Sequence, residues 1–495
     1  MGKGYPLRWR QLFFYRYHTD RYNIEASMQE TSKLRMKALL RIIPVAFCII
    51  LAISNTVCSS EPVFKYESDA TLQALSLKEA PVYPETNFIV FSDPHIYAPS
   101  LGTDGKAFQS YLAQNRKLLK ESVEILESAI DAMKKIDARF IIVPGDLTKD
   151  GELASHELAA SYLNQLEVSG KQVYVIPGNH DINNGAAYKY TGDTTERVPS
   201  ITAAGFARVY REFGYQEALQ RDPYSLSYLA EPQPGLWLLA LDSCRYAEIQ
   251  EGHEPITDGK LSILTLRWIE NILKEAVTKN KAVIATVHHG IIEHYRGHEK
   301  NFGAYIIDDY PSISRLLASY NVRLVFTGHY HAQDITIARW SETSKFTLDV
   351  QTGSLVTYPC PYRVVSIDRS QKATISSYHI QETRTHPDNF QEYARNHAIE
   401  GIKGIATQVI QGYRVERAEA EDLAHQVAEA FVAHYAGDEK LAPGQEPLRT
   451  RGLSVLGWFV VTSRKDLIQG LWHDLEPADN NITIDLKTGK WESLK

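Results

Sequence analysis

Short apolar runs alternate with longer segments of helical periodicity from about residue 82 onward. The runs predict buried strands, because they are short and bounded by Gly, Pro and polar residues. They are 87–93, 139–146, 172–179, 236–243, 281–289 and 323–329. In the segments between them, apolar residues recur every three or four positions, which predicts amphipathic helices at 115–136, 152–168, 261–277 and 311–320. This alternation is typical of α/β proteins, in which helices pack on the faces of a sheet.

The pattern changes twice towards the C-terminus. Strand-like segments without intervening helices follow at 345–354, 362–368 and 372–380, and they predict a mixed sheet or a second sheet that closes the domain. Beyond residue 385 the chain has a helical segment, 418–435, and a hairpin pattern, 480–494. We therefore predict a core domain over 82–384 and a separate small α+β domain over 385–495.

The N-terminal part has the anatomy of a signal peptide. After Met36, a basic stretch leads into a 12-residue apolar run, 42–53, and a short polar exit that ends near Cys58. The run is short for a membrane span, which needs about 20 residues. We therefore expect export to the bacterial cell envelope through residues 36–58, with three outcomes open: a lipid anchor on Cys58, cleavage to a soluble protein, or an uncleaved anchor. Residues 1–35 are expected to be a non-native or disordered extension.

Charge narrows the range of partners. The chain has 53 basic and 60 acidic residues, a net charge of -7. An overall basic field that would attract nucleic acid is therefore absent, and we expect no nucleic-acid-binding surface. An anionic substrate must be held by local positive charge. The oligomeric state is not indicated by these patterns.

Polar residues follow five of the predicted strands at the point where each ends. They are Asp93 and His95; Asp146; Asn179, His180 and Asp181; His288 and His289; and His329 and His331. Each alone has an ordinary explanation, such as a turn-capping Asp or an interior His. The carboxyl ends of strands in an open α/β sheet line a common crevice, however, so these side chains should converge. Imidazole and oxygen donors without cysteine then predict a site for borderline or hard divalent ions.

The order of these residues resembles the calcineurin-like metallophosphoesterase family. The family pattern is Asp-x-His, Gly-Asp, Gly-Asn-His-Asp/Glu, a His, and Gly-His-x-His, and every motif occurs here over roughly residues 85–375. The resemblance implies a two-sheet αββα sandwich as the core, to which this chain adds the small C-terminal α+β segment predicted from its own pattern. It also implies a hydrolase acting on phosphate esters.

The resemblance further implies two divalent ions, of Mn, Fe or Zn. One would be bound by Asp93, His95, Asp146 and His331, and the other by Asp146, Asn179, His288 and His329, with Asp146 as the bridge. Such a pair holds a hydroxide and clamps the phosphate oxygens for in-line attack. His180 is then implied as the general acid for the leaving alkoxide. Asp181 is expected to orient the imidazole of His180 or stabilise its charge.

The fourth motif departs from many phosphodiesterase members, which have prolines after the histidines where this chain has "HHGII". His288 is aligned as the ligand, and His289 is either a substrate contact or part of the pocket wall. Loop residues at the expected rim are candidates for substrate contact or ordinary surface: Tyr188, Lys189, Tyr190, Arg197, His294, Arg296 and His298.

The substrate is expected to be a small organic phosphate ester. The stretch "GDLTKDGE", 145–152, resembles the branch that acts on cyclic nucleotides and glycerophosphodiesters, which favours a diester. The alternatives are a phosphomonoesterase, a nucleotide or pyrophosphate hydrolase of the same fold, and an inactive binding scaffold. Scaffolds commonly lose ligands, whereas this chain has all seven expected ligands and His180.

Overall fold

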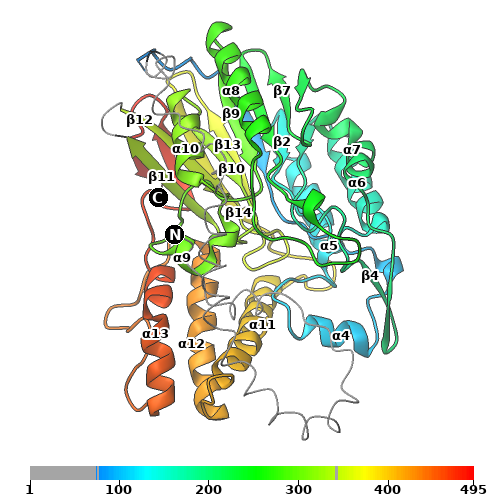
Figure 1. Ribbon diagram of the computed structural model, residues 1–495, viewed down its shortest axis with the longest axis vertical. Coiled ribbons are helices and arrows are strands. Elements are labelled where there is room, and N and C mark those ends of the chain that lie inside the picture. Colours follow the sequence, from blue (N-terminus) through cyan, green and yellow to red (C-terminus); the bar gives the residue numbers. More distant parts are fainter. Residues whose placement is uncertain (1–73, 75–76, 341–343, 495) are drawn as a thin grey trace, which may run out of the picture. The chain divides into compact units, whose positions relative to one another are not determined.

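Two seven-stranded β-sheets lie face to face in the computed structural model, which describes residues 74, 77–340 and 344–494 (Figure 1). The first sheet contains β1 (Thr86–Val90), β2 (Phe140–Val143), β3 (Gln172–Val175), β13 (Pro361–Ile367), β14 (Lys372–His379), β15 (Asn481–Asp485) and β16 (Trp491–Ser493). The second contains β6 (Gln220–Arg221), β7 (Tyr228–Gln233), β8 (Leu236–Leu241), β9 (Ala282–Val287), β10 (Leu324–Thr327), β11 (Asp334–Trp340) and β12 (Lys345–Gln351). The strand orders are β16-β15-β14-β13-β1-β2-β3 and β11-β12-β10-β9-β8-β7-β6.

All six predicted N-terminal strands are confirmed, as β1, β2, β3, β8, β9 and β10. Within each sheet these three strands are mutually parallel. Parallel strands are usually covered on both faces, which explains why their sequences are continuous apolar runs rather than alternating patterns. Phe88 on β1 shows the resulting contacts: its ring lies 4.7 Å from Phe140 on β2 and 5.3 Å from Phe326 on β10 of the opposite sheet.

Helices cover the outer faces of both sheets. α5 (Ser122–Lys134), α6 (Leu153–Val168) and α7 (Ala203–Val209) lie on the side of the first sheet, and α8 (Ile263–Thr278) and α10 (Tyr310–Ser319) on that of the second (Figure 1). This arrangement confirms the α/β sandwich. The helix predicted from residue 115 begins only at Ser122, and residues 115–121 form a non-helical stretch before it. The remaining elements are α4 (Lys106–Leu112), α9 (His298–Phe302), a β4 (Tyr188–Thr191) and β5 (Thr194–Arg197) hairpin, and short helical turns at Pro99–Leu101, Arg211–Tyr215, Tyr246–Glu248 and Gly303–Tyr305.

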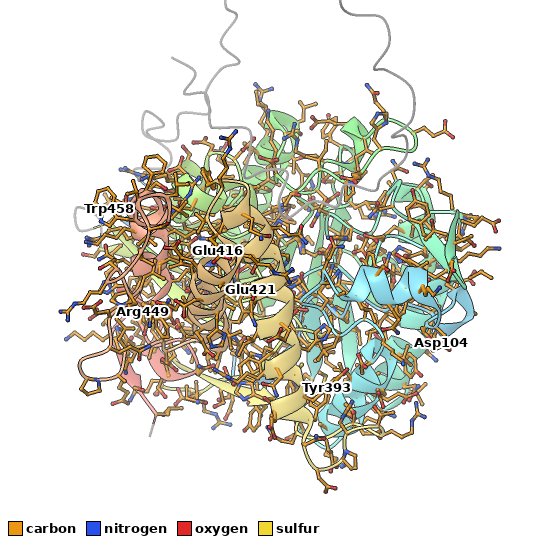
Figure 2. All side chains as sticks on the ribbon, turned by 90° about the horizontal axis from the view of Figure 1, so that it is seen from below. Asp104, Tyr393, Glu416, Glu421, Arg449 and Trp458 are labelled. Carbon is orange, nitrogen blue, oxygen red and sulfur yellow. The ribbon has the colours of Figure 1, made fainter. Side chains whose placement is uncertain are left out.

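The C-terminal segment joins the core rather than folding apart from it. It contains α11 (Phe390–Gln411), α12 (Arg417–Ala436) and α13 (Val455–Leu471), which lie together at one end of the sandwich (Figure 2). The predicted hairpin is present as β15 and β16, but β15 pairs antiparallel with β14 and so extends the first sheet. All described residues belong to the unit Tyr66–Lys495. The hairpin of the C-terminal segment, 385–495, therefore adds strands to the first sheet.

The predicted N-terminal extension, 1–35, and signal segment, 36–58, lie outside the described residues. Within residues 74, 77–340 and 344–494, none of the helices combines the length and the apolar character that crossing a membrane requires.

Candidate metal centre

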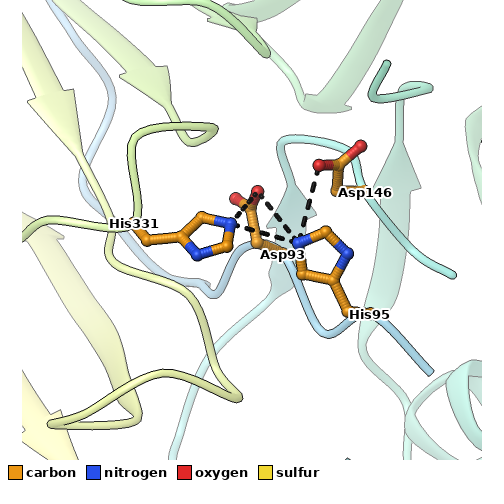
Figure 3. Close-up of side chains that lie close together, drawn as sticks. All are labelled: Asp93, His95, Asp146 and His331. Carbon is orange, nitrogen blue, oxygen red and sulfur yellow. Dashed lines mark hydrogen bonds and ion pairs between the residues drawn. The ribbon is translucent and has the colours of Figure 1, made fainter. Parts of the chain in front are cut away.

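The predicted metal ligands come together where the parallel strands end. Asp93, His95, Asp146 and His331 each offer a nitrogen or oxygen atom, and these atoms lie within 4.8 Å of one another (Figure 3). Asp146, His288 and His329 form a second group by the same measure. Asn179 lies beside this second group, with its Oδ1 atom 3.2 Å from Nε2 of His288. Asp146, the predicted bridge, is the residue that the two groups share.

Short distances to carboxylate oxygens define both groups. Nε2 of His95 lies 3.6 Å from Oδ2 of Asp146, and Nε2 of His331 lies 3.4 Å from Oδ1 of Asp93. On the other side, Nε2 of His288 lies 3.5 Å from the same Oδ2 atom of Asp146. All these side chains are at most 4% exposed, so the charges of the two carboxylates act through a medium that screens them weakly.

Backbone carbonyls select the tautomers of three of the histidines. Nδ1 of His288 lies 2.7 Å from the carbonyl oxygen of Pro144, and Nδ1 of His95 lies 3.3 Å from that of Thr148. A carbonyl only accepts, so the N–H belongs on Nδ1 and the Nε2 lone pair faces the cluster. His329 is reversed, because its Nε2 lies 3.2 Å from the carbonyl oxygen of Thr257 and Nδ1 is left for the cluster. Such outer hydrogen bonds commonly orient metal-binding imidazoles.

The donor set fits divalent cations. Nε2 of His95 and Nε2 of His331 are only 3.1 Å apart, and two facing lone pairs require a proton or a cation between them. Burial lowers the pKa of His331 to about 4 and that of His95 well below its usual value, so a proton is a poor solution. Burial also lowers the pKa of His288, but the Asp146 carboxylate outweighs it and raises that pKa to about 9. The field at Asp146 therefore attracts positive charge.

The backbone at the centre is strained in a consistent way. Positive φ angles occur at Asp93 (50°), His95 (39°), Asp146 (50°), His329 (72°) and His331 (70°). Residues other than glycine rarely adopt this region, and they persist in it only where the surrounding structure imposes it. Five of the seven predicted ligands share this feature, which aims their side chains back into the space between the strand ends.

Two glycines of the motifs allow the loops to approach so closely. A Cβ atom on Gly178 would lie 2.1 Å from Oδ1 of Asp146. A Cβ atom on Gly328 would lie 2.1 Å from Oγ of Ser92 and 2.4 Å from Oδ2 of Asp93. Any larger residue at either position would displace a carboxylate of the centre, so glycine is required there for space.

His180, the predicted general acid, lies at the edge of the centre and is partly accessible, with 25% of its side chain exposed. Its backbone N–H donates to Oδ1 of Asp146 at 2.9 Å, which fixes its position beside the shared acid. Its Nδ1–H donates to Oδ1 of Asp150 at 2.8 Å. Burial opposes ionisation of Asp150, but Lys149 and the hydrogen bond from His180 lower its pKa to about 2. His180 therefore has an ionised carboxylate as its support.

The expectation that Asp181 supports His180 was wrong. The Asp181 carboxylate instead accepts from the backbone N–H groups of Leu147, Thr148 and Gly178, at 3.1, 3.0 and 2.9 Å. Adjacent side chains on a tight turn point in different directions, and Asp181 is fully buried beneath the two loops that carry Asp146 and Asn179. Its role is to hold those loops together.

Two lysines near the centre were missed by the sequence analysis. Lys149 is fully buried, contacts Asp150, and lies 3.3 Å from Oε1 of Glu152. Lys117 is also buried, and burial lowers its pKa to about 8 although Asp150 and Asp146 oppose this effect. The stretch "GDLTKDGE" contains the signal for Lys149 and Asp150. No sequence signal pointed to Lys117, because its segment was predicted as an ordinary helix.

His289 belongs to the wall of the site. Its Nδ1 lies 2.7 Å from Oγ of Ser243 and its Nε2 lies 2.8 Å from the carbonyl oxygen of Thr257, so both nitrogens are engaged. Of the loop candidates, His294 and His298 are buried in an aromatic cluster, Tyr190 is buried, and Lys189 forms an ion pair with Glu196 at 2.8 Å. Arg197 donates to the carbonyl oxygen of Gly252 at 2.9 Å, and Arg296 is exposed.

Comparison with known proteins agrees with this geometry. The family model described as calcineurin-like phosphoesterase matches residues 86–333. The chain therefore belongs to that family, whose members are phosphoesterases, and it contains the buried Asp/His clusters described above. No curated protein matches the chain as a relative.

Solved structures that the chain is similar to include a dimetal phosphatase from Danio rerio, with 14% sequence identity and a TM-score of 0.42, over 60% of this chain and 96% of that one. Another is a purple acid phosphatase from seeds of yellow lupin (Lupinus luteus), at 13% identity and a TM-score of 0.38, over 61% of this chain and 52% of that one.

Proposed function

We propose that this protein hydrolyses a phosphodiester with the help of two divalent ions held in the two Asp/His groups. The observation that carries the proposal is the position of Asp146, whose carboxylate lies within 3.6 Å of imidazole nitrogens from both groups. Asp93, His95, Asp146 and His331 would hold one ion, and Asp146, Asn179, His288 and His329 the other. Ions of the Mn, Fe or Zn type would supply water activation and charge neutralisation at phosphorus.

The chain's own groups supply the rest of the reaction. His180 would protonate the leaving alkoxide, because it is the partly exposed imidazole beside the shared acid and has the ionised Asp150 behind it. Lys117 would add positive charge for an anionic substrate. The preference for a diester rests on the likeness of "GDLTKDGE" to the diesterase branch, and the Lys149–Asp150–His180 arrangement gives that stretch a physical role.

An assay of residues 59–495 tests the proposal directly. Turnover of a simple diester should appear with Mn²⁺ or Zn²⁺, disappear with a chelator, and exceed turnover of the matching monoester. A preference for the monoester would identify the protein as a phosphomonoesterase. Hydrolysis of nucleotides or pyrophosphates alone would identify it as a nucleotide or pyrophosphate hydrolase. If no ester is turned over although the protein is fully loaded with metal, the protein is an inactive binding scaffold.

Replacing Asp150 with Asn should weaken proton donation while leaving the metal ligands intact. Turnover should fall by about 10-fold or more for diesters with alkyl leaving groups, but less than on loss of His180 itself. Diesters that release p-nitrophenolate, which leaves without a proton, should be affected little. Steady-state kinetics with both substrate types, together with metal content, checks this result, and equal losses on both would show that Asp150 acts on structure instead.

We further propose that residues 36–58 export the chain and that Cys58 is the site at which a lipid would tether it to the cell envelope. Membrane fractionation of Cys58→Ala against the unaltered chain separates the lipid anchor from the two other outcomes.

A further inference from the structure

Asp349 is a buried carboxylate on β12, outside the set of expected metal ligands. β12 lies between β10 and β11 in the second sheet, and the side chain of Asp349 is fully buried. Its Oδ2 atom lies 3.6 Å from Nε2 of His294, which is also fully buried. A carboxylate removed from water is costly unless hydrogen bonds or opposite charges compensate for it. The hydrogen-bond partners of Asp349 therefore indicate why the fold retains it.

One oxygen of Asp349 fixes the start of the loop that carries His329. Oδ1 accepts from the hydroxyl of Thr327 at 2.5 Å, and Thr327 is the last residue of β10, two before His329. β10 and β12 are paired in parallel, so this bond joins neighbouring strands at the edge of the sheet where the ligands gather. The bond therefore limits how far His329 can move from the metal centre.

The other oxygen of Asp349 fixes the loop that carries His288. Oδ2 accepts from the backbone N–H groups of Ile291 and Ile292 at 2.6 and 3.2 Å, three and four residues after His288. Successive N–H groups that converge on one oxygen form a small anion-binding concavity, so the loop bends around the carboxylate. Asp349 therefore joins the loops of two predicted ligands, His288 and His329.

The same two loops are also in direct contact. The backbone N–H of Gly328 donates to the carbonyl oxygen of His288 at 3.1 Å. The imidazole rings of His288 and His329 lie with their centroids 4.6 Å apart. This spacing is set by the backbone bond on one side and by the bonds to Asp349 on the other.

The first sheet has a buried carboxylate in a comparable place. Asp181 accepts from backbone N–H groups of the loops after β2 and β3, which carry Asp146 and Asn179. Asp146 belongs to both Asp/His groups, so a change at Asp181 disturbs both of them. Asp349 differs, because the two ligands that it positions, His288 and His329, both belong to the second group. Loss of Asp349 should therefore affect that group alone.

We propose that Asp349 is a positioning residue that sets the spacing of His288 and His329, and so the affinity for the second ion. The inference rests on the proposed function, in which the second ion is the one held by Asp146, Asn179, His288 and His329. Loss of a group that orients metal ligands commonly weakens metal binding about 10- to 100-fold. We expect a change of this size at the second ion and none at the first.

Titration of the full chain with Co²⁺ after removal of metal by a chelator tests the inference. Visible absorption follows the binding, and elemental analysis counts the ions. The unaltered chain should bind two ions, and Asp349→Asn should bind the second about 10- to 100-fold more weakly, because one amide oxygen cannot serve both Thr327 and the loop N–H groups. In a His288→Ala background, where only the first ion remains, Asp349→Asn should leave its binding unchanged.

Variants of Thr327 cover the case in which Asp349→Asn does not fold. Thr327→Val removes the hydroxyl at similar shape and should weaken the second ion about 10-fold, whereas Thr327→Ser keeps the hydroxyl and should bind it normally. Thr374→Val is the matched control on β14, where the hydroxyl bonds to that of Thr483. It should bind both ions normally.

Unchanged binding of the second ion in Asp349→Asn, or in Thr327→Val, would overturn the inference and leave the proposed function intact. Equal weakening of both ions would also overturn it, because a carboxylate that only stabilises the fold acts on both groups alike. A Thr327→Ser chain as weak as Thr327→Val would trace the effect to the lost shape rather than to the bond. Fewer than two ions on the unaltered chain would overturn the inference together with the proposed function.

Discussion

Asp146→Asn should abolish turnover and metal loading together. Its carboxylate is the only group among the described residues that lies in both Asp/His clusters, and the amide of Asn keeps the shape while removing the charge. Both ions lose a ligand at once, so the loss should exceed the roughly 100-fold effects that follow from changing an outer hydrogen-bond partner of a metal ligand. Turnover of the preferred ester and elemental analysis of the purified protein measure the two effects.

Asp131→Asn provides the control, because it makes the same chemical change on the exposed face of α5. This variant should keep full activity and full metal content. Near-normal turnover of Asp146→Asn would show that the two clusters do not share the carboxylate in function. Loss of activity with both ions still bound would assign Asp146 a role in the reaction other than holding metal.

The convergence of the ligand residues could be predicted from the sequence because they follow predicted strands, whereas their assignment to two ions came from the resemblance to the family. Asp93, Asp146 and His329 follow short apolar runs that predict buried strands, and parallel strands place their ends at one edge. Glycines at 178 and 328 precede ligands where any side chain would collide. Motifs of this kind can be recognised in the sequence without knowledge of how the strands pack.

The support of His180 could not be predicted in the same way. Asp181 is adjacent in sequence and was the natural choice, yet its carboxylate turns to the backbone of residues 147 and 148. Asp150 takes the role because the loop after β2 brings it against the loop after β3, a long-range contact that no local pattern encodes. The same reason explains why Lys117 was missed.

The C-terminal segment shows a second limit of prediction from local sequence patterns. Helix α12 and the hairpin were visible as local patterns, but α11, α13 and the partner strand of the hairpin were not. β15 pairs with β14 across more than a hundred residues of sequence, and α11, α12 and α13 lie between the two strands in the chain. Local periodicity predicts which residues face a core, but it does not say which sheet they extend.

His180→Ala should lower turnover with both ions still bound. The variant loses the imidazole that would protonate the leaving alkoxide, while its backbone N–H still donates to Asp146. Removal of a general acid typically costs about 10²- to 10⁴-fold, and the cost should be largest for diesters with alkyl leaving groups. Substrates that release p-nitrophenolate need no proton on the leaving group, so their turnover should change much less.

His425→Ala makes the same truncation on an exposed face of α12 and should leave both substrates unaffected. The decisive quantity is the ratio of turnover between good and poor leaving groups, because a general loss of structure or of metal lowers both alike. A His180→Ala protein that loses activity equally on both would exclude His180 as the acid. If Asp150 affects turnover through His180, Asp150→Asn should add nothing further to a His180→Ala background, whereas independent roles would make the two losses multiply.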